Sequence, residues 1–519
     1  MTKGTAMAYP RLYNAASDMV DAHVAAGRDE KIAFVDGTRQ ITYGAFAAET
    51  NRAANLLTSF GLHREQRVAL LLPDAIDFPV CFWGAIKAGV VPIPLNTLLT
   101  AEQYGYILAD SRARALIVSP ALLQVVQPIL GGLSELTHLI VAGGDAPVYG
   151  FSLQAELAAQ PETFTTAATA ADETAFWLYS SGSTGAPKGA RHVHTSMIET
   201  ARLYGQGVLG ISADDVILSA AKLFFAYGLG NGMSFPMSVG ATTILLAERP
   251  TPAAVFATLK THQPTIFCGG PTLYGAILAE ATCTPASGSQ RLRTCISAGQ
   301  ALPAEIGRAW SNRFGVDILD GVGSTEMLHI YVSNRAGQVR LGSSGTAVDG
   351  YQIKLVDEAA LPVAPGEIGE MMVRGPTAAD GYWNQREKSR ATFEGQWMRT
   401  GDKYTASADG FYTYAGRTDD MFKVSGIWVS PFEVESALIG HASILEAAVV
   451  PAEDTDGLVK PKAFVILKGG IEKSEALEAA LKEHVKVAAG PWKYPRWIVF
   501  IDSLPKTATG KIQRFKLRG

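Results

Sequence analysis

The chain has 519 residues, 47% of them hydrophobic and 18% charged, and a formal net charge of -4. This apolar content excludes a mainly disordered protein, and the balance of 45 basic against 49 acidic residues gives no sign of a nucleic-acid partner or a polybasic membrane anchor. The length predicts about three folding units.

The N-terminal region has no apolar stretch of the kind that forms a signal peptide. The most apolar segment, Val68–Leu95, is interrupted by Asp74, Asp77 and Lys87, so we expect no membrane-spanning helix. The four cysteines show neither C-x-x-C pairs nor metal-site spacing, which predicts buried free thiols. We therefore expect a cytoplasmic protein with no membrane partner.

Up to about residue 341, short β-type runs alternate with helical patterns. The predicted strands are Arg67–Leu72, Ala115–Val118, Leu139–Val141, Ala175–Tyr179, Thr242–Leu246, Thr265–Cys268 and Thr294–Ser297. The predicted helices include Thr42–Leu57 and Ala301–Arg313. This alternation is typical of an α/β fold in which helices cover the faces of mostly parallel sheets.

The pattern changes near Gly342, where segments between glycine and proline turns predict antiparallel strands. These segments are Tyr351–Val356, Gly369–Arg374 and Gly410–Ala415. An α+β pattern begins after Arg417, with helices at Ser430–Ile439 and Lys473–Val487 and strands at Ala447–Pro451 and Lys462–Leu467. We place a domain boundary near Thr418, because the roughly 100 residues beyond it match an ordinary small domain.

The strongest chemical signal is the segment Tyr179–Gly189, which follows the apolar run Phe176–Leu178. Its glycines expose backbone N–H groups, its hydroxyls donate hydrogen bonds and Lys188 adds a cation, and polyphosphate oxygens need such groups. The segment is neither a Walker A loop nor a dinucleotide fingerprint, which disfavours Walker-type hydrolysis and Rossmann redox chemistry. Its composition also fits a flexible surface loop.

A second glycine-containing motif, Asp320–Glu326, follows a strand-like run. Thr325 offers a hydroxyl to a phosphate and Glu326 offers a hard carboxylate to Mg²⁺, while helix N-capping is the alternative. In a third motif, Trp397–Asp402, the last carboxylate can accept two hydrogen bonds from a ribose diol, although an ordinary turn aspartate fits the same pattern.

Two further motifs lie in the last part of the chain. The charged, turn-rich segment Gly416–Gly426 falls at the expected boundary and fits either a hinge or a solvated linker. The segment Leu504–Arg514 carries Lys511 in a polar context that is unlike a protein core, and a frayed basic tail is the alternative.

With these five motifs in this order, the chain resembles the adenylate-forming superfamily, which includes acyl- and aryl-CoA synthetases, peptide-synthetase adenylation domains and beetle luciferases. The resemblance covers nearly the whole chain. Within the superfamily, the segments Lys222–Gly232 and Gly323–Ile330 look most like those of benzoate–CoA ligases.

The resemblance implies a particular division of the chain. A large N-terminal domain, residues 1–418, is expected to contain two α/β subdomains, at about 1–172 and 173–341, and a small β-barrel-like subdomain at 342–418. A small, mobile α+β domain is expected at 419–519.

The resemblance also implies a reaction in two halves. A carboxylate attacks the α-phosphate of ATP to form an acyl-adenylate and pyrophosphate, and the thiol of CoA then displaces AMP. ATP and CoA are co-substrates, the cofactor is Mg²⁺, and pre-placed donors compensate the crowded negative charge. An aryl acid is the expected substrate, with benzoate as the first candidate.

By the same resemblance, Lys511, Thr325 and Glu326 are the catalytic residues, and Glu326 is also the Mg²⁺ ligand. Residues 180–189 are matched to the loop that holds the β- and γ-phosphates, and Asp402 to the ribose. The full set expected to bind ATP is Ser180, Ser181, Gly182, Ser183, Thr184, Gly185, Lys188, Ser297, Ala298, Gly299, Gln300, Asp320, Gly321, Val322, Asp402 and Arg417.

Lys511 is implied to bridge the substrate carboxylate and the ATP oxygens, a role that suits a long, flexible cation. Because it is expected on the mobile domain, it would leave the site when the domain rotates about the hinge at Asp419. That rotation would form a CoA channel from Lys423, Ser425, Gly426 and Trp428. A lysine acyltransferase and a deacylase are expected regulators, since acylation of Lys511 removes its charge.

The expected acyl pocket combines aromatic and small residues, which together can form a flat slot for a ring. It comprises Phe225, Ala226, Tyr227, Gly228, Gly269, Gly323, Ser324, His329 and Ile330. Ordinary core packing of the aromatic residues is the alternative. His329 is expected to approach the carboxylate or the far edge of the ring, or to be a structural histidine.

Other functions remain open at this point. The chain could be a CoA ligase for another aryl, short-chain or fatty acid, or a stand-alone adenylation module that loads a carrier protein. The segment Phe224–Tyr227 offers no acidic side chain for the ammonium of an amino acid, which counts against the adenylation module. Lys511 and the hydroxyl-rich segment count against a non-enzymatic binding protein. We expect a monomer or a homodimer.

Overall fold

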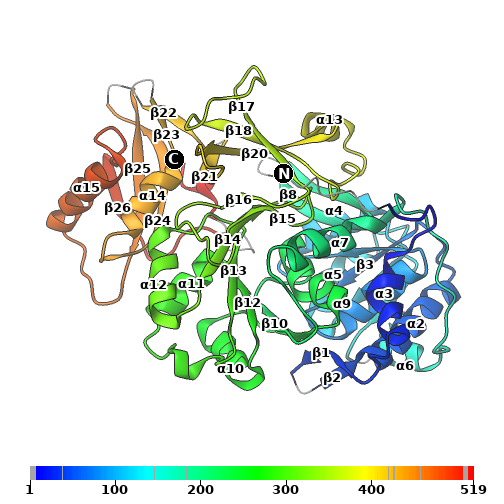
Figure 1. The fold of residues 1–519 in the computed structure, drawn as a ribbon. Coiled ribbons are helices and arrows are strands. Elements are labelled where there is room, and N and C mark those ends of the chain that lie inside the picture. Colours follow the sequence, from blue (N-terminus) through cyan, green and yellow to red (C-terminus); the bar gives the residue numbers. More distant parts are fainter. Residues whose placement is uncertain are drawn as a thin grey trace.

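The structure is a computed structural model that describes residues 8–37, 39–144, 147–182, 185–418, 420–424, 427–455, 457–506 and 512–518. Two parallel sheets with their helices form the larger part of the molecule, and the C-terminal strands and helices lie at one side of it (Figure 1). The α/β fold expected from the sequence is confirmed.

The first sheet has five strands in the order β4-β3-β5-β6-β7, and each neighbouring pair is parallel. Its strands are β3 (Arg67–Leu71), β4 (Val91–Pro94), β5 (Ala115–Val118), β6 (His138–Val141) and β7 (Phe151–Ser152). Most of their residues are buried because helices cover the sheet on both faces. These helices are α2 (Tyr43–Ser59), α3 (Asp77–Lys87), α4 (Ala101–Ser111), α5 (Pro120–Leu130) and α6 (Leu153–Ala158).

The second sheet has nine strands in the order β16-β15-β14-β13-β12-β10-β11-β1-β2. The parallel strands are β1 (Ile32–Asp36), β10 (Val216–Ser219), β11 (Thr242–Leu245), β12 (Ile266–Gly269), β13 (Thr294–Ser297) and β14 (Ile318–Gly323). The antiparallel edge strands are β2 (Arg39–Thr42), β15 (Ile330–Ser333) and β16 (Thr346–Ala347). Strand β1 pairs with β11 across a long sequence separation, so an early segment of the chain completes the second sheet.

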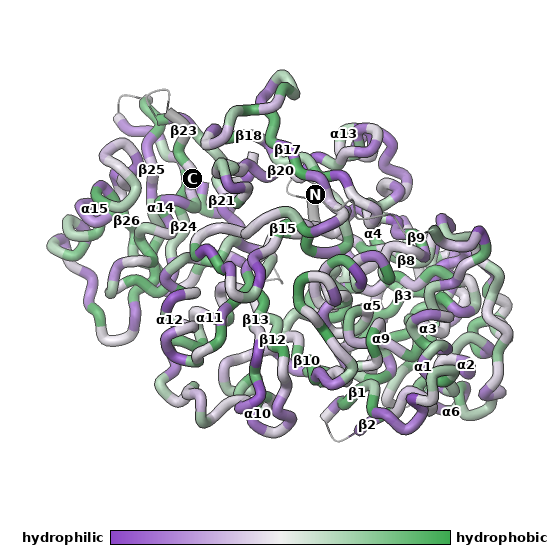
Figure 2. The backbone as a smooth tube through the Cα atoms, viewed as in Figure 1, coloured by the Kyte–Doolittle hydropathy of each residue, from purple (hydrophilic) through white to green (hydrophobic). Residues whose placement is uncertain are grey.

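Helices and short helical turns connect these strands. They are α1 (Ala22–Ala25), α7 (His194–Thr200), α8 (Ala226–Leu229), α9 (Phe235–Val239), α10 (Pro252–His262), α11 (Pro271–Ala279) and α12 (Ala304–Phe314), with π-helical turns at Ser17–Asp21, Ala201–Gln206 and Gly230–Ser234. Helix α12 is amphipathic: hydrophilic residues alternate with apolar ones along it in Figure 2, and it buries Trp310. Amphipathic helices of this kind seal one face of a sheet while they face water on the other.

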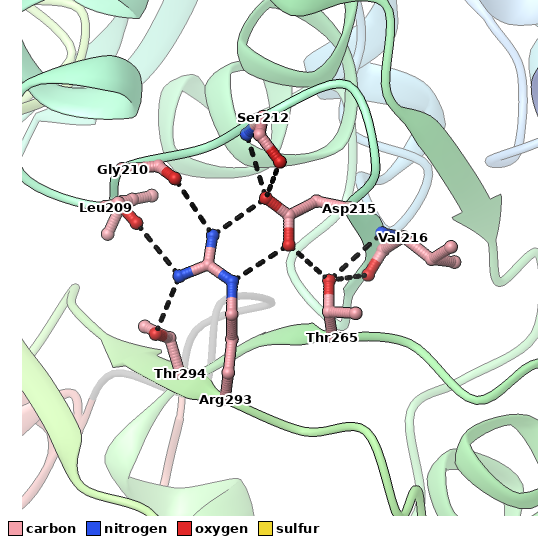
Figure 3. Close-up of polar contacts among 8 residues, drawn as sticks. All are labelled: Leu209, Gly210, Ser212, Asp215, Val216, Thr265, Arg293 and Thr294. Carbon is pink, nitrogen blue, oxygen red and sulfur yellow. Dashed lines mark hydrogen bonds and ion pairs between the residues drawn. The ribbon is translucent and has the colours of Figure 1, made fainter.

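Three neighbouring interior strands of the second sheet are tied together at their amino ends by one ionic cluster (Figure 3). Asp215 precedes β10, Thr265 precedes β12 and Arg293 precedes β13. Arg293 binds the Asp215 carboxylate in a bidentate manner, with Nε–Oδ1 and Nη2–Oδ2 distances of 2.9 and 2.8 Å, and the Thr265 hydroxyl donates to the same carboxylate at 2.7 Å. The cluster therefore holds the edge of the sheet that lies opposite the carboxyl ends of its strands.

The Ser/Gly-rich motif forms a two-stranded antiparallel ribbon, β8 (Thr174–Gly182) with β9 (Gly185–Val193). The predicted strand at 175–179 is confirmed, but it pairs with β9 and not within a parallel sheet, and β8 packs beside β4. The alternative of a surface loop does not hold for the described residues of the motif, because Ser180 pairs with Lys188 and Gly182 with Gly185.

A third, antiparallel sheet follows, made of β17 (Gln352–Val356), β18 (Gly369–Arg374), β19 (Phe393–Glu394), β20 (Trp397–Ala406) and β21 (Tyr412–Arg417). Helix α13 (Arg386–Thr392) is inserted before β19. The predicted change to antiparallel structure after Gly342 is confirmed.

The C-terminal part has a small ribbon of β22 (Phe422–Val424) and β23 (Ile427–Val429). A three-stranded sheet follows, formed by β24 (Ile444–Glu453), β25 (Val459–Leu467) and β26 (Trp497–Phe500). Its helices are α14 (Pro431–Ile439) and α15 (Glu475–Ala489), and a short 3₁₀ turn lies at Arg514–Lys516. Another 3₁₀ turn, Pro285–Ser287, lies in the second sheet's part of the chain. The predicted α+β pattern is confirmed. In the part of the chain that the structure describes, no helix combines the length and apolarity needed to cross a bilayer.

Candidate functional site

Part of the predicted nucleotide and acid sites lies at one edge of the second sheet. Strands β10, β12, β13 and β14 are mutually parallel, so their carboxyl ends lie at the same edge. Gly269 ends β12, Ser297 ends β13 and Gly323 ends β14, and the segment that contains Phe225–Gly228 follows β10. Sequence positions separated by about a hundred residues are thereby brought to one place.

Lys188 and Glu326 form the ionic centre of this site. The Lys188 ammonium lies 3.3 Å from Glu326 Oε1, although the two residues come from a ribbon and from the turn after β14. Burial alone would raise the pKa of Glu326, but the Lys188 charge and a hydrogen bond from Tyr382 together hold it below its ordinary value. Glu326 is therefore an ionised carboxylate at neutral pH.

The Tyr382 hydroxyl lies between these two charges. It donates to Glu326 Oε1 at 2.6 Å and accepts from Lys188 Nζ at 2.7 Å. The Lys188 ammonium also lies 4.2 Å from the centre of the Tyr382 ring. Tyr382 was not among the predicted site residues, because an aromatic residue after a glycine has no distinctive chemical pattern by itself.

The described part of the Ser/Gly-rich motif presents one further donor beside these charges. The Ser180 hydroxyl oxygen is buried and has no hydrogen-bond partner among the described residues, and its backbone pairs with that of Lys188. A buried polar atom without a protein partner fits a position that contacts a ligand. Ser183 and Thr184 lie outside the described residues, and of Ser181, Gly182 and Gly185 only the backbone is described.

Thr325 and Glu326 lie in the turn between β14 and β15, and no helix begins there, so the helix N-cap alternative is wrong. Two hydrogen bonds fix this turn. His192 Nε2 lies 2.8 Å from the Thr325 carbonyl oxygen, and Ser324 Oγ accepts from the Met327 N–H at 3.2 Å. Burial lowers the pKa of His192 to about 4, so the ring is neutral and donates its Nε2 proton to that carbonyl.

The donor set at Glu326 fits one hard divalent cation. The hydrogen bond from Tyr382 and the ion pair with Lys188 both involve Glu326 Oε1, and a Mg²⁺ ion is commonly held by one or two carboxylates together with substrate phosphates and water. Within the described ranges, no group of three or more His, Cys, Asp or Glu side chains is arranged to hold a metal. A site that depends on phosphate oxygens for its remaining ligands agrees with both observations.

Ser297 and Asp320 are cross-strand neighbours at the ends of β13 and β14. Burial raises the pKa of Asp320 to about 8. A hydrogen bond with the Ser297 side chain and hydrogen bonds with the backbone of Leu302 and Gly321 act in the opposite direction and offset only part of this rise in pKa. Gly299, just beyond β13, has a φ of 90°, a conformation that side chains rarely adopt, and it lets the chain turn at this edge.

Asp402 and Arg417 face each other across β20 and β21. Arg417 Nη1 lies 3.2 Å from Asp402 Oδ1, and the Asp402 side chain is mostly buried while that of Arg417 is partly exposed. Gly401, with a φ of 70°, allows the close approach, since a Cβ there would lie 3.1 Å from Arg417 Nη2. The structure thus brings together the carboxylate predicted to bind ribose and the guanidinium predicted to lie near the nucleotide.

The predicted acyl pocket contains an aromatic cluster around His329. The imidazole centroid lies 5.0 Å from the ring of Tyr204, 5.6 Å from that of Tyr227 and 4.5 Å from that of Phe235. Burial lowers the pKa of His329 to about 3, so the imidazole is neutral, and its Nε2 lies 3.3 Å from the Tyr227 carbonyl oxygen. Its Nδ1 is buried without a partner among the described residues.

Residues 228 and 323, which lie next to this aromatic cluster, must be glycine for steric reasons. A Cβ on Gly228 would lie 2.1 Å from the Lys222 carbonyl oxygen, and one on Gly323 would lie 2.5 Å from the His329 carbonyl oxygen. The Tyr227 hydroxyl is held by the carbonyl oxygens of Gly269 and Ile296, at 3.1 and 3.0 Å. Tyr227 is therefore fixed by strand ends, which is more specific than general core packing.

Asp74 is a second residue that sequence reasoning missed as part of the site. It follows β3 of the first sheet, is 3% exposed, and its Oδ1 accepts from the Leu223 N–H at 3.0 Å. It therefore anchors the start of the aromatic segment from the neighbouring sheet. Its signal was a lone carboxylate inside an apolar run, which the sequence analysis treated only as an interruption.

Several predicted residues of the C-terminal part lie outside the described residues, namely Lys511, Asp419, Ser425 and Gly426. Lys423 and Trp428 are cross-strand partners in β22 and β23. Lys506 and Ile512, which flank the segment that contains Lys511, form an antiparallel bridge. The Arg514 guanidinium binds the Glu435 carboxylate at 2.7 and 2.9 Å.

The four cysteines are buried and free, as predicted.

Comparison with known proteins covers nearly the whole chain. Residues 21–383 match the AMP-binding enzyme family, and residues 433–511 match the AMP-binding enzyme C-terminal domain. The chain is 56% identical to a benzoate–CoA ligase of Thauera aromatica over 99% of this chain and 97% of the relative. It is 54% identical to a 4-hydroxybenzoate–CoA/benzoate–CoA ligase of Rhodopseudomonas palustris, over 98% of this chain and 94% of the relative.

Two solved structures are similar over nearly the whole chain. One is a benzoate CoA ligase from Burkholderia xenovorans, with 50% identity and a TM-score of 0.91 over 98% of this chain and 100% of the other. The other is an anthranilate CoA ligase in complex with anthranoyl-AMP, with 43% identity and a TM-score of 0.95 over 98% and 97% of the two chains.

Proposed function

This chain belongs to the AMP-binding enzyme family, and on that premise we propose that it is an AMP-forming benzoate–CoA ligase. It converts benzoate, ATP and CoA to benzoyl-CoA, AMP and diphosphate through a benzoyl-adenylate. The observation that carries this function is the 56% identity to a benzoate–CoA ligase over 99% of the chain.

In the first half of the reaction, a benzoate oxygen attacks the α-phosphate of ATP, and the bond to the β-phosphate breaks with release of diphosphate. We assign Ser180 and Lys188 to the β- and γ-phosphates, because a buried hydroxyl without a partner and an ammonium lie side by side on the β8–β9 ribbon. Such pre-placed donors stabilise charge without reorganisation during the step.

Thr325 and Glu326 are assigned to the α-phosphate and to Mg²⁺. Glu326 is mostly buried and ionised, and it is held in the turn after β14, where its position is set by Tyr382 and Lys188. A bound Mg²⁺ would polarise the phosphoryl oxygens and neutralise part of their charge. The residues around Glu326 orient the carboxylate in advance.

The nucleoside is assigned to two surfaces of the same edge. The strand ends that contain Ser297–Gln300 and Asp320–Val322 would enclose the adenine, and Asp402 would bind the ribose hydroxyls with Arg417 beside it. Asp402 and Arg417 lie in the antiparallel sheet and so approach the nucleotide from another side than the strand ends do.

The ring of benzoate is assigned to the slot around His329. Its neutral imidazole and the rings of Tyr227 and Phe235 give an apolar, aromatic surface, to which an uncharged ring is well suited. No charged side chain is needed to meet an amino group, in agreement with an aryl acid as the substrate.

We further propose that residues 1–418 form the body of the enzyme and that 419–519 rotate about Asp419 between the two half-reactions. Lys511 would serve the adenylation half. In the second half, the CoA sulfur attacks the carbonyl carbon of the adenylate and the bond to the AMP oxygen breaks, with Lys423, Ser425, Gly426 and Trp428 along the pantetheine channel.

Release of diphosphate from ATP, measured with a panel of carboxylic acids and with or without CoA, tests the function. Benzoate should give the highest kcat/KM, with fatty and short-chain acids far lower. Full thioester formation should require CoA, and diphosphate should still form slowly without it. A preference for a fatty acid, or release that depends on an amino acid, would refute the assignment.

A further inference from the structure

We propose that Tyr382 is a positioning residue for the adenylation half-reaction, which orients the Glu326 carboxylate and the Lys188 ammonium through one phenol. This inference rests on the proposed function and assigns a role to a side chain outside the five sequence motifs. The family resemblance did not point to it; it follows from the contacts in the structure.

The phenol makes two different hydrogen bonds with opposite charges. Its proton goes to Glu326 Oε1 at 2.6 Å, and its oxygen lone pair accepts from Lys188 Nζ at 2.7 Å. Hydrogen bonds with an ionised partner are the strong ones in proteins. One hydroxyl therefore sets the orientation of the carboxylate and gives the ammonium a second partner besides the carboxylate.

The backbone places Tyr382 in register with both charges. Tyr382 forms an antiparallel bridge with Ala190, two residues beyond Lys188 on β9, and the Trp383 N–H donates to the Gly189 carbonyl oxygen at 2.8 Å. On the other side, the Ala379 N–H donates to the Glu326 carbonyl oxygen at 2.7 Å. The segment is thus bonded to the ribbon and to the turn that carry the two charges.

Packing behind Trp383 holds this segment rigidly. The Trp383 ring lies 4.7 Å from the ring of Trp177, and the guanidinium of Arg67 lies 5.5 Å from its centre. The Trp383 indole N–H donates to the Asp110 carbonyl oxygen at 2.9 Å. Because Trp383 is fixed by these contacts, the movement of the adjacent Tyr382 is limited, as a pre-organised site requires.

The arrangement also explains how Lys188 can serve a phosphate. Its ammonium has three donors on a flexible stem, and one of them points to the phenol while the ring lies beneath the charge at 4.2 Å. The remaining donors can turn to phosphate oxygens without loss of this contact. Tyr382 would thus hold the lysine stem at the site throughout the step.

The test compares Tyr382→Phe with Tyr104→Phe, a matched control. Tyr104 is a buried tyrosine of α4 whose hydroxyl donates to the Asn96 carbonyl oxygen at 2.8 Å, away from the charged centre. Four quantities are measured for each variant: ATP–diphosphate exchange, conversion of synthetic benzoyl-adenylate and CoA to thioester, calorimetric binding of ATP with and without Mg²⁺, and the thermal midpoint.

Tyr382→Phe should lower kcat of the adenylation half by about 10- to 100-fold, the effect of one hydrogen bond to a charged group. The thioester half and the thermal midpoint should stay close to those of the unsubstituted enzyme, and ATP binding should weaken more in the presence of Mg²⁺ than in its absence. In a Lys188→Ala background, the same substitution should cost less, because the two side chains act together.

An equal fall in both half-reactions, or a fall that follows the thermal midpoint, would mean a structural role and overturn the inference. Unchanged adenylation in Tyr382→Phe would overturn it as well, with the proposed function intact. If the unsubstituted enzyme itself fails to release diphosphate with benzoate, it is the proposed function that fails.

Discussion

The Cα atom of Gly230 lies directly against the imidazole ring of His329: a Cβ at residue 230 would be 2.5 Å from His329 Cδ2 and 2.9 Å from Phe235 Cζ. Gly230 begins a π-helical turn, an irregularity that is frequent at functional sites. The absence of a side chain there sets the position of the histidine, and with it the shape of the proposed ring slot.

Gly230→Ala should push the imidazole toward the ring slot. Overpacking of this kind costs about 1–3 kcal/mol of folding stability. Because a misplacement of about 1 Å at the site can cost on the order of 100-fold in rate, kcat/KM for benzoate should fall roughly 10- to 100-fold, with a much smaller change in KM for ATP. Gly131→Ala is the matched control, since a Cβ at that helix end meets no atom within 4 Å. Equal effects of the two substitutions on benzoate kinetics would contradict the assignment of the slot.

Lys511→Ala should abolish adenylation but still allow conversion of pre-made benzoyl-adenylate and CoA to the thioester. The reason is that the ammonium compensates negative charge only while the carboxylate attacks the α-phosphate. Each half-reaction is assayed separately, by diphosphate release and by thioester absorbance. Parallel loss of both would rule out a two-position C-terminal domain.

Acetylation at the same position should have the same selective effect, because it removes the charge and keeps the length of the side chain. Enzyme with acetyl-lysine incorporated at residue 511 can be assayed before and after treatment with a deacetylase. Full adenylation activity in the acetylated enzyme would exclude regulation at this site.

Asp215→Asn should destabilise the second sheet, because it breaks the bidentate pair with Arg293 (Figure 3). Burial alone would raise the pKa of Asp215, but the bonds from Arg293 and Thr265 outweigh it and lower the pKa to about 2. The loss should be about 1–3 kcal/mol at neutral pH, reduced from a fully buried pair because Arg293 is partly exposed.

The pH dependence of this loss has a definite sign. With a folded pKa of about 2 and an ordinary value near 4, the stabilisation is present above about pH 4 and disappears as the pH falls toward 2. The difference in thermal midpoint between the two proteins should therefore shrink in acid. Asp409→Asn, which breaks an exposed pair with Arg340, should change the midpoint far less.

Asp74→Asn should behave in the opposite way. Burial raises the pKa of Asp74 to about 6, against which the Lys222 charge and the Leu223 N–H act only in part. Because the pKa of Asp74 is higher in the folded than in the unfolded protein, folding favours the protonated carboxyl group. The contribution of this group to the free energy of unfolding is therefore fully present below about pH 4 and is lost as the pH rises through 6.

The uncharged asparagine can still accept from the Leu223 N–H, and the variant should be more stable than the native protein by about 1–2 kcal/mol above pH 7. Thermal unfolding at pH 5 and pH 8 measures the difference. A variant less stable at pH 8 than at pH 5, each relative to the native protein, would mean that Asp74 is ionised and stabilised by Lys222.

Local patterning predicted the succession of elements, and together with the family resemblance it predicted the chemistry of the motifs. Strands such as Ala115–Val118 and Thr294–Ser297 were predicted with their observed bounds, because buried parallel strands are short apolar runs. The roles expected for Glu326, Lys188 and Asp402 followed from residue types that phosphates, Mg²⁺ and ribose require.

Only the tertiary structure decided which residues meet. The strand pairing of the Ser/Gly-rich motif, the place of β1 in the second sheet and the contact of Tyr382 with two charges depend on pairs far apart in the chain. Tyr382 and Asp74 carry no local pattern that separates them from other tyrosines and aspartates. Their roles depend on the residues that strand register and burial place beside them. Those neighbours lie far away in the chain, so the local sequence around Tyr382 or Asp74 does not indicate them.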